Sequence, residues 1–211
     1  MRRAVPWYGE PHIQRYAEML WRLDRVPGEA AGVPVDIEPE TAADHDAIRA
    51  VVRAAFDTHV EVAGLVDMIR ASPQFVPGLS LVARLDGEVV GHVMLSHAEL
   101  EDDDRVRRQV LTLSPLAVAP AHQGRGIGSA LVPAGLAAAE AMAENLVILE
   151  GSPRYYTRFG FRDCRTLGIH VTLPDWAPPE AGMAYPLTAC DASLRGRLVY
   201  PPAFAAAGAG R

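Results

Sequence analysis

A glycine-rich segment between a predicted strand and a predicted helix constrains this chain more than any other feature. Residues 123–129 read Gln-Gly-Arg-Gly-Ile-Gly-Ser, after a strand-like apolar run at 111–118 and before a helix-like run that reaches about Asn145. Because glycine has no Cβ, the backbone there can approach a ligand closely. The first amides of the helix have no partner within it, and they lie at the positive end of its dipole. The segment therefore predicts a binding site for a phosphate or diphosphate group.

Two common phosphate-binding loops do not fit this segment. The NTPase loop, G-x-x-x-x-G-K-S/T, needs a lysine, and none follows these glycines. The dinucleotide loop, G-x-G-x-x-G, needs a third glycine where this chain has Ser129 or Leu131, depending on the glycine from which the pattern starts. The strand before the segment also follows antiparallel hairpins, whereas a dinucleotide site begins with a βαβ unit.

Hydrophobic periodicity and turn signals predict an α/β (α+β mixed) fold, with a central mixed sheet of about six to seven strands flanked by helices. Asp86-Gly87 marks a tight hairpin, and the acidic turn at 101–104 marks a second one, which we interpret as a solvated loop and not as a metal site. Thr41 is the expected N-cap of the first helix of the domain. Pro133 predicts a kink in the helix after the glycines, or a later start of that helix. The expected strands are 33–37, 79–85, 88–97, 107–118, 146–149, 161–164, 169–173 and 183–187, and the expected helices are 41–56, 61–71 and 154–159 besides the one after the glycines.

Composition narrows the class of protein. The chain has 211 residues, of which 49% are hydrophobic and 22% charged, as in ordinary globular proteins. A net charge of -6 without a basic stripe argues against a nucleic-acid surface, and no apolar run has the ~20 residues that a membrane helix needs. Two cysteines and no secretory signal predict a cytoplasmic protein with free thiols and no metal centre.

We divide the chain into three parts. Residues 1–32 are predicted to be a helical extension and linker, whose apolar stripe packs on its own domain or forms a dimer contact. Residues 33–204 form the main domain, and residues 205–211 a frayed tail. The sequence leaves monomer and homodimer open.

Two motifs together give this chain a family resemblance. Residues 123–128 resemble Q/R-x-x-G-x-G/A, the acetyl-CoA pyrophosphate loop of the GNAT superfamily of N-acetyltransferases. Tyr156 to Phe161 is similar to the Y-x-x-x-G-F ending of that family's last helix, and Tyr200 to Phe204 looks like the YhbS-like subgroup of predicted acetyltransferases. The resemblance covers roughly residues 33–190 and implies a central sheet with splayed strands. The implied co-substrate is acetyl-CoA, without a metal, and the implied reaction is transfer of an acetyl group to a primary amine.

The resemblance also implies roles for particular residues. The diphosphate is expected on the backbone amides of the loop, with the Ser129 hydroxyl as a further donor and the Arg125 side chain either supplying charge or pointing to solvent. The pantetheine arm is expected along the edge of residues 116–118, where the Leu116 or Val118 amide would polarise the thioester carbonyl. The implied cofactor-binding residues are Leu116, Ala117, Val118, Gln123, Gly124, Arg125, Gly126, Ile127, Gly128 and Ser129.

Tyr156 is the predicted general acid, which would protonate the departing thiolate, and its alternative role is packing against the cofactor. Glu150 is the leading candidate for the general base, ahead of His92, His97 and Glu99. We expect Tyr155 in the core and Arg158 at the surface or near a phosphate. Direct attack of the amine in a ternary complex needs no covalent acyl-enzyme. The acceptor, a small-molecule or peptide amine, stays open, and so do a longer acyl donor and a non-catalytic acyl-CoA-binding sensor.

Overall fold

The fold rests on one large mixed sheet. The computed structural model describes residues 32–56, 60–173, 175 and 177–208, so the predicted N-terminal helix lies outside the described residues. Among these residues, nine strands form the sheet, in the order β1-β2-β3-β4-β5-β8-β6, and β9 pairs with β3 and β7. The strands are β1 (Asp36–Pro39), β2 (Phe75–Leu85), β3 (Glu88–Glu101), β4 (Arg107–Val118), β5 (Leu146–Glu150), β6 (Arg162–Asp163), β7 (Ile169–His170), β8 (Gly182–Pro186) and β9 (Gly196–Val199).

The sheet has more strands than the six to seven predicted. The stretches that become β6 and β7 were expected as strands at 161–164 and 169–173, although only two residues of each pair in the sheet. β9, with four residues, was not expected, because it is too short to leave a visible alternation of apolar and polar residues. The mixed α/β architecture is confirmed: β4 and β5 are parallel, as are β7 and β9, and the other strand pairs are antiparallel.

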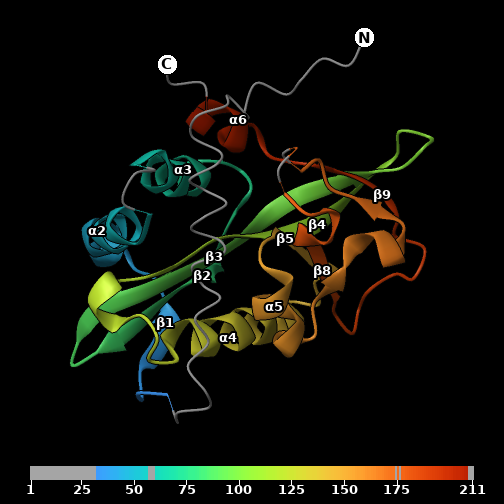
Figure 1. The fold of residues 1–211 in the computed structure, drawn as a ribbon. Helices are drawn as coiled ribbons and strands as arrows, with labels where there is room; N and C mark the ends of the chain where they lie inside the picture. Colours follow the sequence, from blue (N-terminus) through green and yellow to red (C-terminus); the bar gives the residue numbers. More distant parts are fainter. Residues whose placement is uncertain (1–31, 57–59, 174, 176, 209–211) are drawn as a thin grey trace.

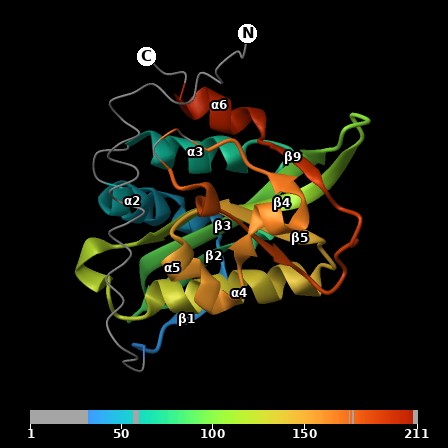
Figure 2. The same ribbon diagram turned by 45° about the vertical axis from the view of Figure 1, so that its right-hand side comes forward.

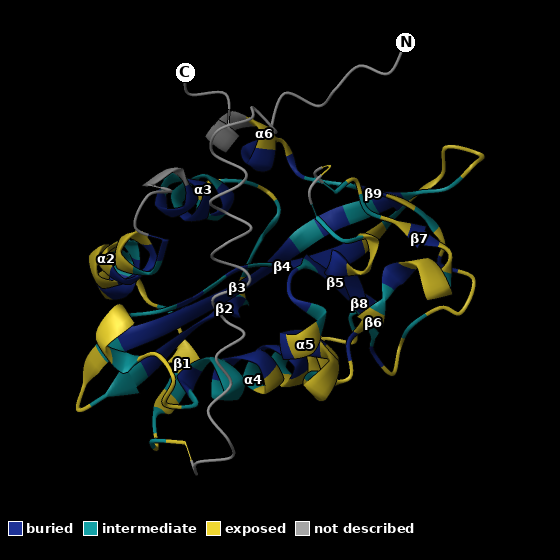
Figure 3. Cartoon of the chain, in the orientation of Figure 1, coloured by how far each residue is buried: buried dark blue, intermediate teal, exposed yellow. Residues whose placement is uncertain are grey.

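Helices cover both faces of the sheet (Figure 1, Figure 2). The first face carries α2 (His45–Phe56), α3 (Val60–Arg70) and α6 (Pro202–Gly208), and the second carries α4 (Ile127–Ala141) and the short α5 (Pro153–Tyr156). Side chains of β3 alternate between the two layers: Val93 and Leu95 pack under α4, and Met94 packs under α2 and α3. Figure 3 shows the resulting buried layer along the central strands.

The hairpin of β3 and β4 differs from the predicted register. We expected Gly91–Leu95 opposite Thr112–Leu116, but Gly91 pairs with Val118 and Leu95 with Leu113. The register shifts after Val93, because two residues of β4, Ser114 and Pro115, lie opposite a single residue of β3. A proline cannot donate to the ladder and is typical of such a bulge.

β4 and β5 separate soon after they meet. Their only paired positions in the described structure are Leu111 with Val147 and Thr112 with Ile148, although β4 continues to Val118 against β3. From residue 113 to 118, the edge of β4 on the side of β5 therefore has no paired strand in the described structure, and we call the space along this open edge the gap. This is the splayed arrangement that the family resemblance implied.

Two element boundaries correct the sequence predictions. α4 begins at Ile127, directly after the glycines, and carries Pro133 in its interior, so the alternative of a later start is wrong. The chain also continues as α6 to Gly208, so residues 205–208 are helical and do not belong to the predicted frayed tail. Residues 209–211 lie outside the described part. Thr41 does cap the domain's first helical turn, in a capping box with Asp44.

Candidate active site

The glycine-rich segment forms a turn that exposes a row of amides. Gly124 and Gly126 have φ angles of 72° and 83°, in the left-handed region that favours glycine. Over the described chain, the amides of residues 124–129 donate to no protein acceptor, and the helical bonds of α4 begin with Ala130 donating to the Gly126 carbonyl at 3.0 Å. Gln123 is the exception among the predicted amides, since its N–H donates to the Pro120 carbonyl at 3.4 Å. Six adjacent donors therefore remain at the positive end of α4.

The junction between the predicted linker, which ends at residue 32, and the main domain, which begins at residue 33, braces this turn. The Val33 amide donates to the Arg125 carbonyl at 3.1 Å. A Cβ placed on Gly126 would lie 2.9 Å from the Cα of Gly32. The backbone of residues 32 and 33 is therefore in contact with the turn, and sequence reasoning missed it because no motif marks such a contact.

α5 and the 3-10 turn that follows it, Thr157–Phe159, lie beside the same amides. Arg158 Nη2 donates to the Ser129 hydroxyl at 2.6 Å. A Cβ on Gly128 would lie 2.8 Å from the Tyr155 hydroxyl, so only glycine leaves room for that tyrosine. Burial raises the pKa of Tyr155, although the charge of Arg158 acts in the opposite direction. The Tyr155 hydroxyl therefore stays protonated beside the first turn of α4.

The end of β4 turns alternate amides toward the gap. The Ala119 amide donates to the Val90 carbonyl at 2.9 Å, so it points toward β3. Backbone direction alternates along a strand, so the amides of Leu116 and Val118 point away from β3 and into the gap. The Val118 carbonyl points the same way and accepts the Gln123 side-chain amide at 3.0 Å. The Gln123 side chain thus connects the end of β4 to the glycine-rich turn.

Tyr156, the predicted general acid, is buried. Its ring lies edge-on to Tyr155, with 4.9 Å between ring centroids, and to Phe161 at 5.6 Å. Its side chain is 4% exposed, and a Cβ on Gly151 would collide with its ring. Neighbouring side chains and backbone thus fix the ring of Tyr156 on several sides. Its role as general acid stays a prediction.

Glu150, the predicted base, ends β5 and pairs with Gly182 of β8. The Tyr200 hydroxyl donates to Glu150 Oε1 at 2.5 Å. Tyr200 directly follows β9, and the pairing of Val199 with Glu99 of β3 brings it there. The sequence singled out Tyr200 only as part of a subgroup motif, because a contact across fifty residues leaves no local pattern.

The alternative bases lie elsewhere. Glu99 is paired with Arg107 at 2.9 Å, and His97 Nε2 contacts Glu144 at 2.8 Å. His92 is fully buried among side chains of the α2 and α3 layer, with its Nε2 at 3.0 Å from the Ser80 hydroxyl and 3.3 Å from Glu40. Burial lowers the pKa of His92, so its ring is neutral.

Glu40 is the centre of that buried network. It accepts two hydrogen bonds from Arg70, at 2.6 and 3.1 Å, and one from Ser80 at 2.6 Å. Burial raises the pKa of Glu40, but the hydrogen bonds of its partners outweigh burial and hold that pKa well below its usual range. The network ties the start of the domain to β2, β3 and α3, which is a structural task.

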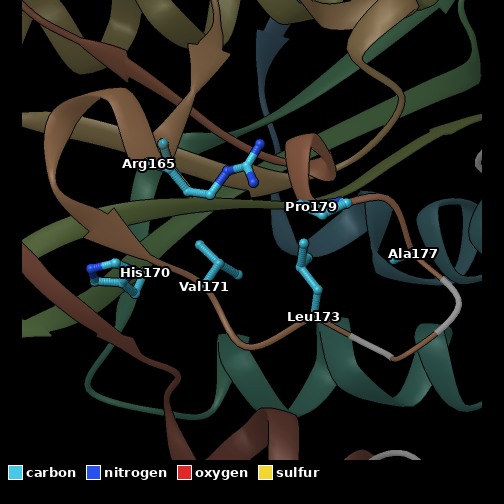
Figure 4. Close-up of a pocket in the computed structure, with 7 residues that line it drawn as sticks. Arg165, His170, Val171, Leu173, Ala177 and Pro179 are labelled. Atoms are coloured by element: carbon cyan, nitrogen blue, oxygen red, sulfur yellow. The ribbon is translucent and has the colours of Figure 1, made fainter.

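A separate cavity of about 250 Å³ lies beside β7 (Figure 4). Its lining is Cys164, Arg165, His170, Val171, Leu173, Ala177 and Pro179. Arg165 is already bound to the Asp163 carboxylate, at 2.6 Å for the shorter contact. Burial raises the pKa of the Cys164 thiol, which disfavours the nucleophilic thiolate. The cavity is therefore lined by an arginine whose charge is already paired, and it offers no activated nucleophile.

The described residues contain neither a candidate membrane span nor a candidate metal site. No helix among them is long and apolar enough to cross a membrane. No group of three or more His, Cys, Asp or Glu side chains among them is placed to hold a metal ion.

Comparison with known proteins agrees with this geometry. Residues 46–161 match the model of the acetyltransferase (GNAT) family, which is more than half of the chain. A 122-residue stretch is 35% identical to the uncharacterized N-acetyltransferase YjhQ of Escherichia coli strain K12, over 57% of this chain and 66% of that protein. The chain thus spans slightly less than two thirds of that relative. The uncharacterized N-acetyltransferase YhbS of the same strain is 33% identical over 126 residues, which cover 59% of this chain and 72% of YhbS.

Solved structures give the same result. The crystal structure of the GNAT family N-acetyltransferase YhbS from Escherichia coli in complex with CoA superposes with a TM-score of 0.70 and 26% identity, over 84% of this chain and 96% of that one. A GNAT family acetyltransferase from Brucella melitensis in complex with acetyl-CoA gives 0.65 and 28%, over 81% and 98%. On the family match, the relatives and the fold together, the chain belongs to the GNAT family of acetyltransferases.

Proposed function

We propose that this protein transfers an acetyl group from acetyl-CoA to a primary amine, by direct attack of the amine in a ternary complex. The observation that carries the proposal is the row of six amides at residues 124–129, which have no protein partner in the described chain and lie beside the open edge of β4. The CoA and acetyl-CoA complexes of the two similar structures support it.

The residues present fit acetyl-CoA. The amides of the turn and the Ser129 hydroxyl supply donors for the diphosphate, at the positive end of α4. Gly126 and Gly128 lack the Cβ atoms that would collide with Gly32 and with the Tyr155 hydroxyl, so the turn can hold its amides in this position. The backbone groups of Leu116 and Val118 that face the gap supply an edge for the amides of the pantetheine arm. These positions follow one another from the turn into the gap, which is the order of diphosphate, pantetheine and thioester in the co-substrate.

Three groups then serve the chemistry. The Leu116 or Val118 amide donates to the thioester carbonyl oxygen and stabilises the negative charge that develops there. Tyr156 gives its phenolic proton to the departing sulfur, for which a phenol is a suitable donor. Glu150 accepts the proton of the attacking amine, directly or through water. The Tyr200 hydroxyl holds the Glu150 carboxylate in place.

Calorimetry with acetyl-CoA and with NADH tests the cofactor. We expect the protein to bind acetyl-CoA and not NADH. If it bound NADH and failed to bind acetyl-CoA, the proposal would be refuted. A panel of small-molecule and peptide amines, monitored by thiol release, then tests for transfer. Acetyl-CoA and longer acyl-CoA donors, compared in the same assay, give the preference for acyl length.

A second candidate function is an acyl-CoA-binding sensor without catalysis. Two observations favour it: Glu150 already accepts a hydrogen bond from Tyr200, and the Tyr156 side chain is 4% exposed. Tight binding of acetyl-CoA without thiol release, with any amine of the panel or with water, would support the sensor. Acetylation of any one amine would exclude it.

A further inference from the structure

We propose that Arg158 binds the diphosphate of the acyl-CoA, as the charged partner of the amides at the start of α4. This inference rests on the proposed function and assigns one residue to that same site. The family motif covers the amides of the glycine-rich turn, and Arg158 comes from a different part of the chain, twenty-nine residues after Ser129.

The Arg158 guanidinium is held in place by three contacts. Its central carbon lies 4.3 Å from the centre of the Tyr155 ring and 4.6 Å from that of the Phe159 ring. Its Nη2 donates to the Ser129 hydroxyl at 2.6 Å. Stacking of a guanidinium on aromatic rings restricts its orientation, so less freedom is lost when it binds a ligand. Arg158 is nevertheless exposed, so a ligand can reach it.

The charge of Arg158 has no counter-charge from the described part of the protein. No carboxylate lies within ion-pair distance of it in the described residues, whereas Arg49, Arg70, Arg84, Arg107 and Arg165 each have one. Arg158 also lies next to the positive end of the α4 dipole, where a cation is unfavourable. A cation, a helix start and a row of unpartnered amides thus concentrate positive potential at one place. A bound anion would balance it, and a guanidinium fork matches the geometry of phosphate oxygens.

The contact with Ser129 indicates which phosphate Arg158 binds. CoA carries a diphosphate and, at its far end, a 3′-phosphate. Ser129 is the third residue of α4, and its amide is one of the six assigned to the diphosphate. A side chain bonded to Ser129 lies at the diphosphate position, so we assign Arg158 to that group.

Calorimetry with three ligands tests the assignment. CoA has both phosphate groups, dephospho-CoA lacks the 3′-phosphate, and pantetheine lacks both. Arg158→Gln should weaken CoA and dephospho-CoA by the same factor, at least about tenfold, because a hydrogen bond to a charged group is lost. Pantetheine should bind the variant and the wild type equally. Arg158→Lys, which keeps the charge but loses the fork, should give an intermediate affinity.

Arg154→Gln is the matched control, since Arg154 is an exposed arginine four residues earlier. It should leave the affinity for all three ligands unchanged. The assignment is overturned if Arg158→Gln binds CoA as tightly as wild type does, or if it loses affinity for CoA but not for dephospho-CoA. It is also overturned if Arg158→Gln loses as much affinity for pantetheine as for CoA, or if Arg154→Gln loses as much affinity as Arg158→Gln. If wild type binds none of the three ligands, the proposed function fails instead. A cooperative thermal transition of each variant, checked beforehand, separates these outcomes from unfolding.

Discussion

Substitution of Gly126 by alanine tests the turn and its brace together. Gly126 has a φ of 83°, and the left-handed region costs a residue with a Cβ about 1–2 kcal/mol. The added Cβ would also lie 2.9 Å from the Cα of Gly32, which is backbone and cannot rotate away. If residues 32 and 33 move aside, the hydrogen bond from Val33 to Arg125 is lost, which costs about 1 kcal/mol more.

These terms predict that Gly126→Ala lowers the free energy of unfolding by about 2–3 kcal/mol. For a chain of this size, each kcal/mol shifts Tm by about 2–4 °C, so Tm should fall by about 4–12 °C. The same change reorients the amides assigned to the diphosphate, so the affinity for CoA should fall too. Circular dichroism measures Tm, and calorimetry well below Tm measures affinity for the folded protein alone.

Gly64→Ala is the control for this experiment. Gly64 lies inside α3, and a Cβ there would meet nothing within 4 Å. Alanine is up to about 1 kcal/mol more favourable than glycine in a helix interior, so Tm should stay equal or rise by about 2–4 °C. Affinity for CoA should not change. If Gly126→Ala kept both the Tm and the affinity of wild type, both the strain at Gly126 and the placement of the diphosphate would be refuted.

Three further substitutions test the remaining assignments. Tyr156→Phe should lower turnover by at least about tenfold at nearly unchanged CoA affinity, since general acids contribute ~10²–10⁴ in rate, and unaltered turnover would show that water protonates the sulfur. Tyr200→Phe should lower kcat/KM, because the carboxylate of Glu150 loses the hydrogen bond that holds it in place, and an unchanged kcat/KM would argue against Glu150 as the base. Burial lowers the pKa of His92 in the folded state, so the unfolded chain takes up the proton first as the pH falls. The stability that neutral His92 contributes is therefore complete above about pH 6.5 and declines as the pH falls toward the pKa of His92 in the folded protein. His92→Gln should therefore reduce the loss of Tm between pH 7.5 and 5.5, and an unchanged loss would assign it to other groups.

Local sequence signals predicted the parts of the fold that depend on neighbouring residues. Asp86-Gly87 forms the expected hairpin turn with positive φ at both residues, 52° and 85°. The glycine-rich segment lies between a strand and a helix, as expected, because its amides and its φ angles are set within a few residues. The predicted β3 and β4 register is already one residue off next to the turn, where Glu101 pairs with Arg107. The bulge at Ser114 and Pro115, which a simple count across the turn ignores, adds a second residue to the error.

Long-range contacts of the candidate site left no such signal. The brace by residues 32 and 33, and the bond from Tyr200 to Glu150, depend on how the sheet brings distant segments together. β9 has only four residues, yet its pairing with β3 places Tyr200 beside β5. A strand of that length is too short to show hydrophobic periodicity, so the sequence could not predict that Tyr200 contacts Glu150.

The two adjacent tyrosines of α5 each occupy space that a glycine elsewhere in the chain leaves free. Consecutive residues of a short helix point in different directions, and here the rings of Tyr155 and Tyr156 lie at 80° to each other. Gly128 leaves room for the Tyr155 hydroxyl at the start of α4, and Gly151 leaves room for the Tyr156 ring beside β5. The family motif identifies only Tyr156, through its distance from the next glycine. Because Gly128 also belongs to the glycine-rich turn, that turn both exposes amides and admits Tyr155, whose ring in turn holds Arg158. The positions that we propose for the diphosphate and for the thioester are thus connected through one four-residue helix.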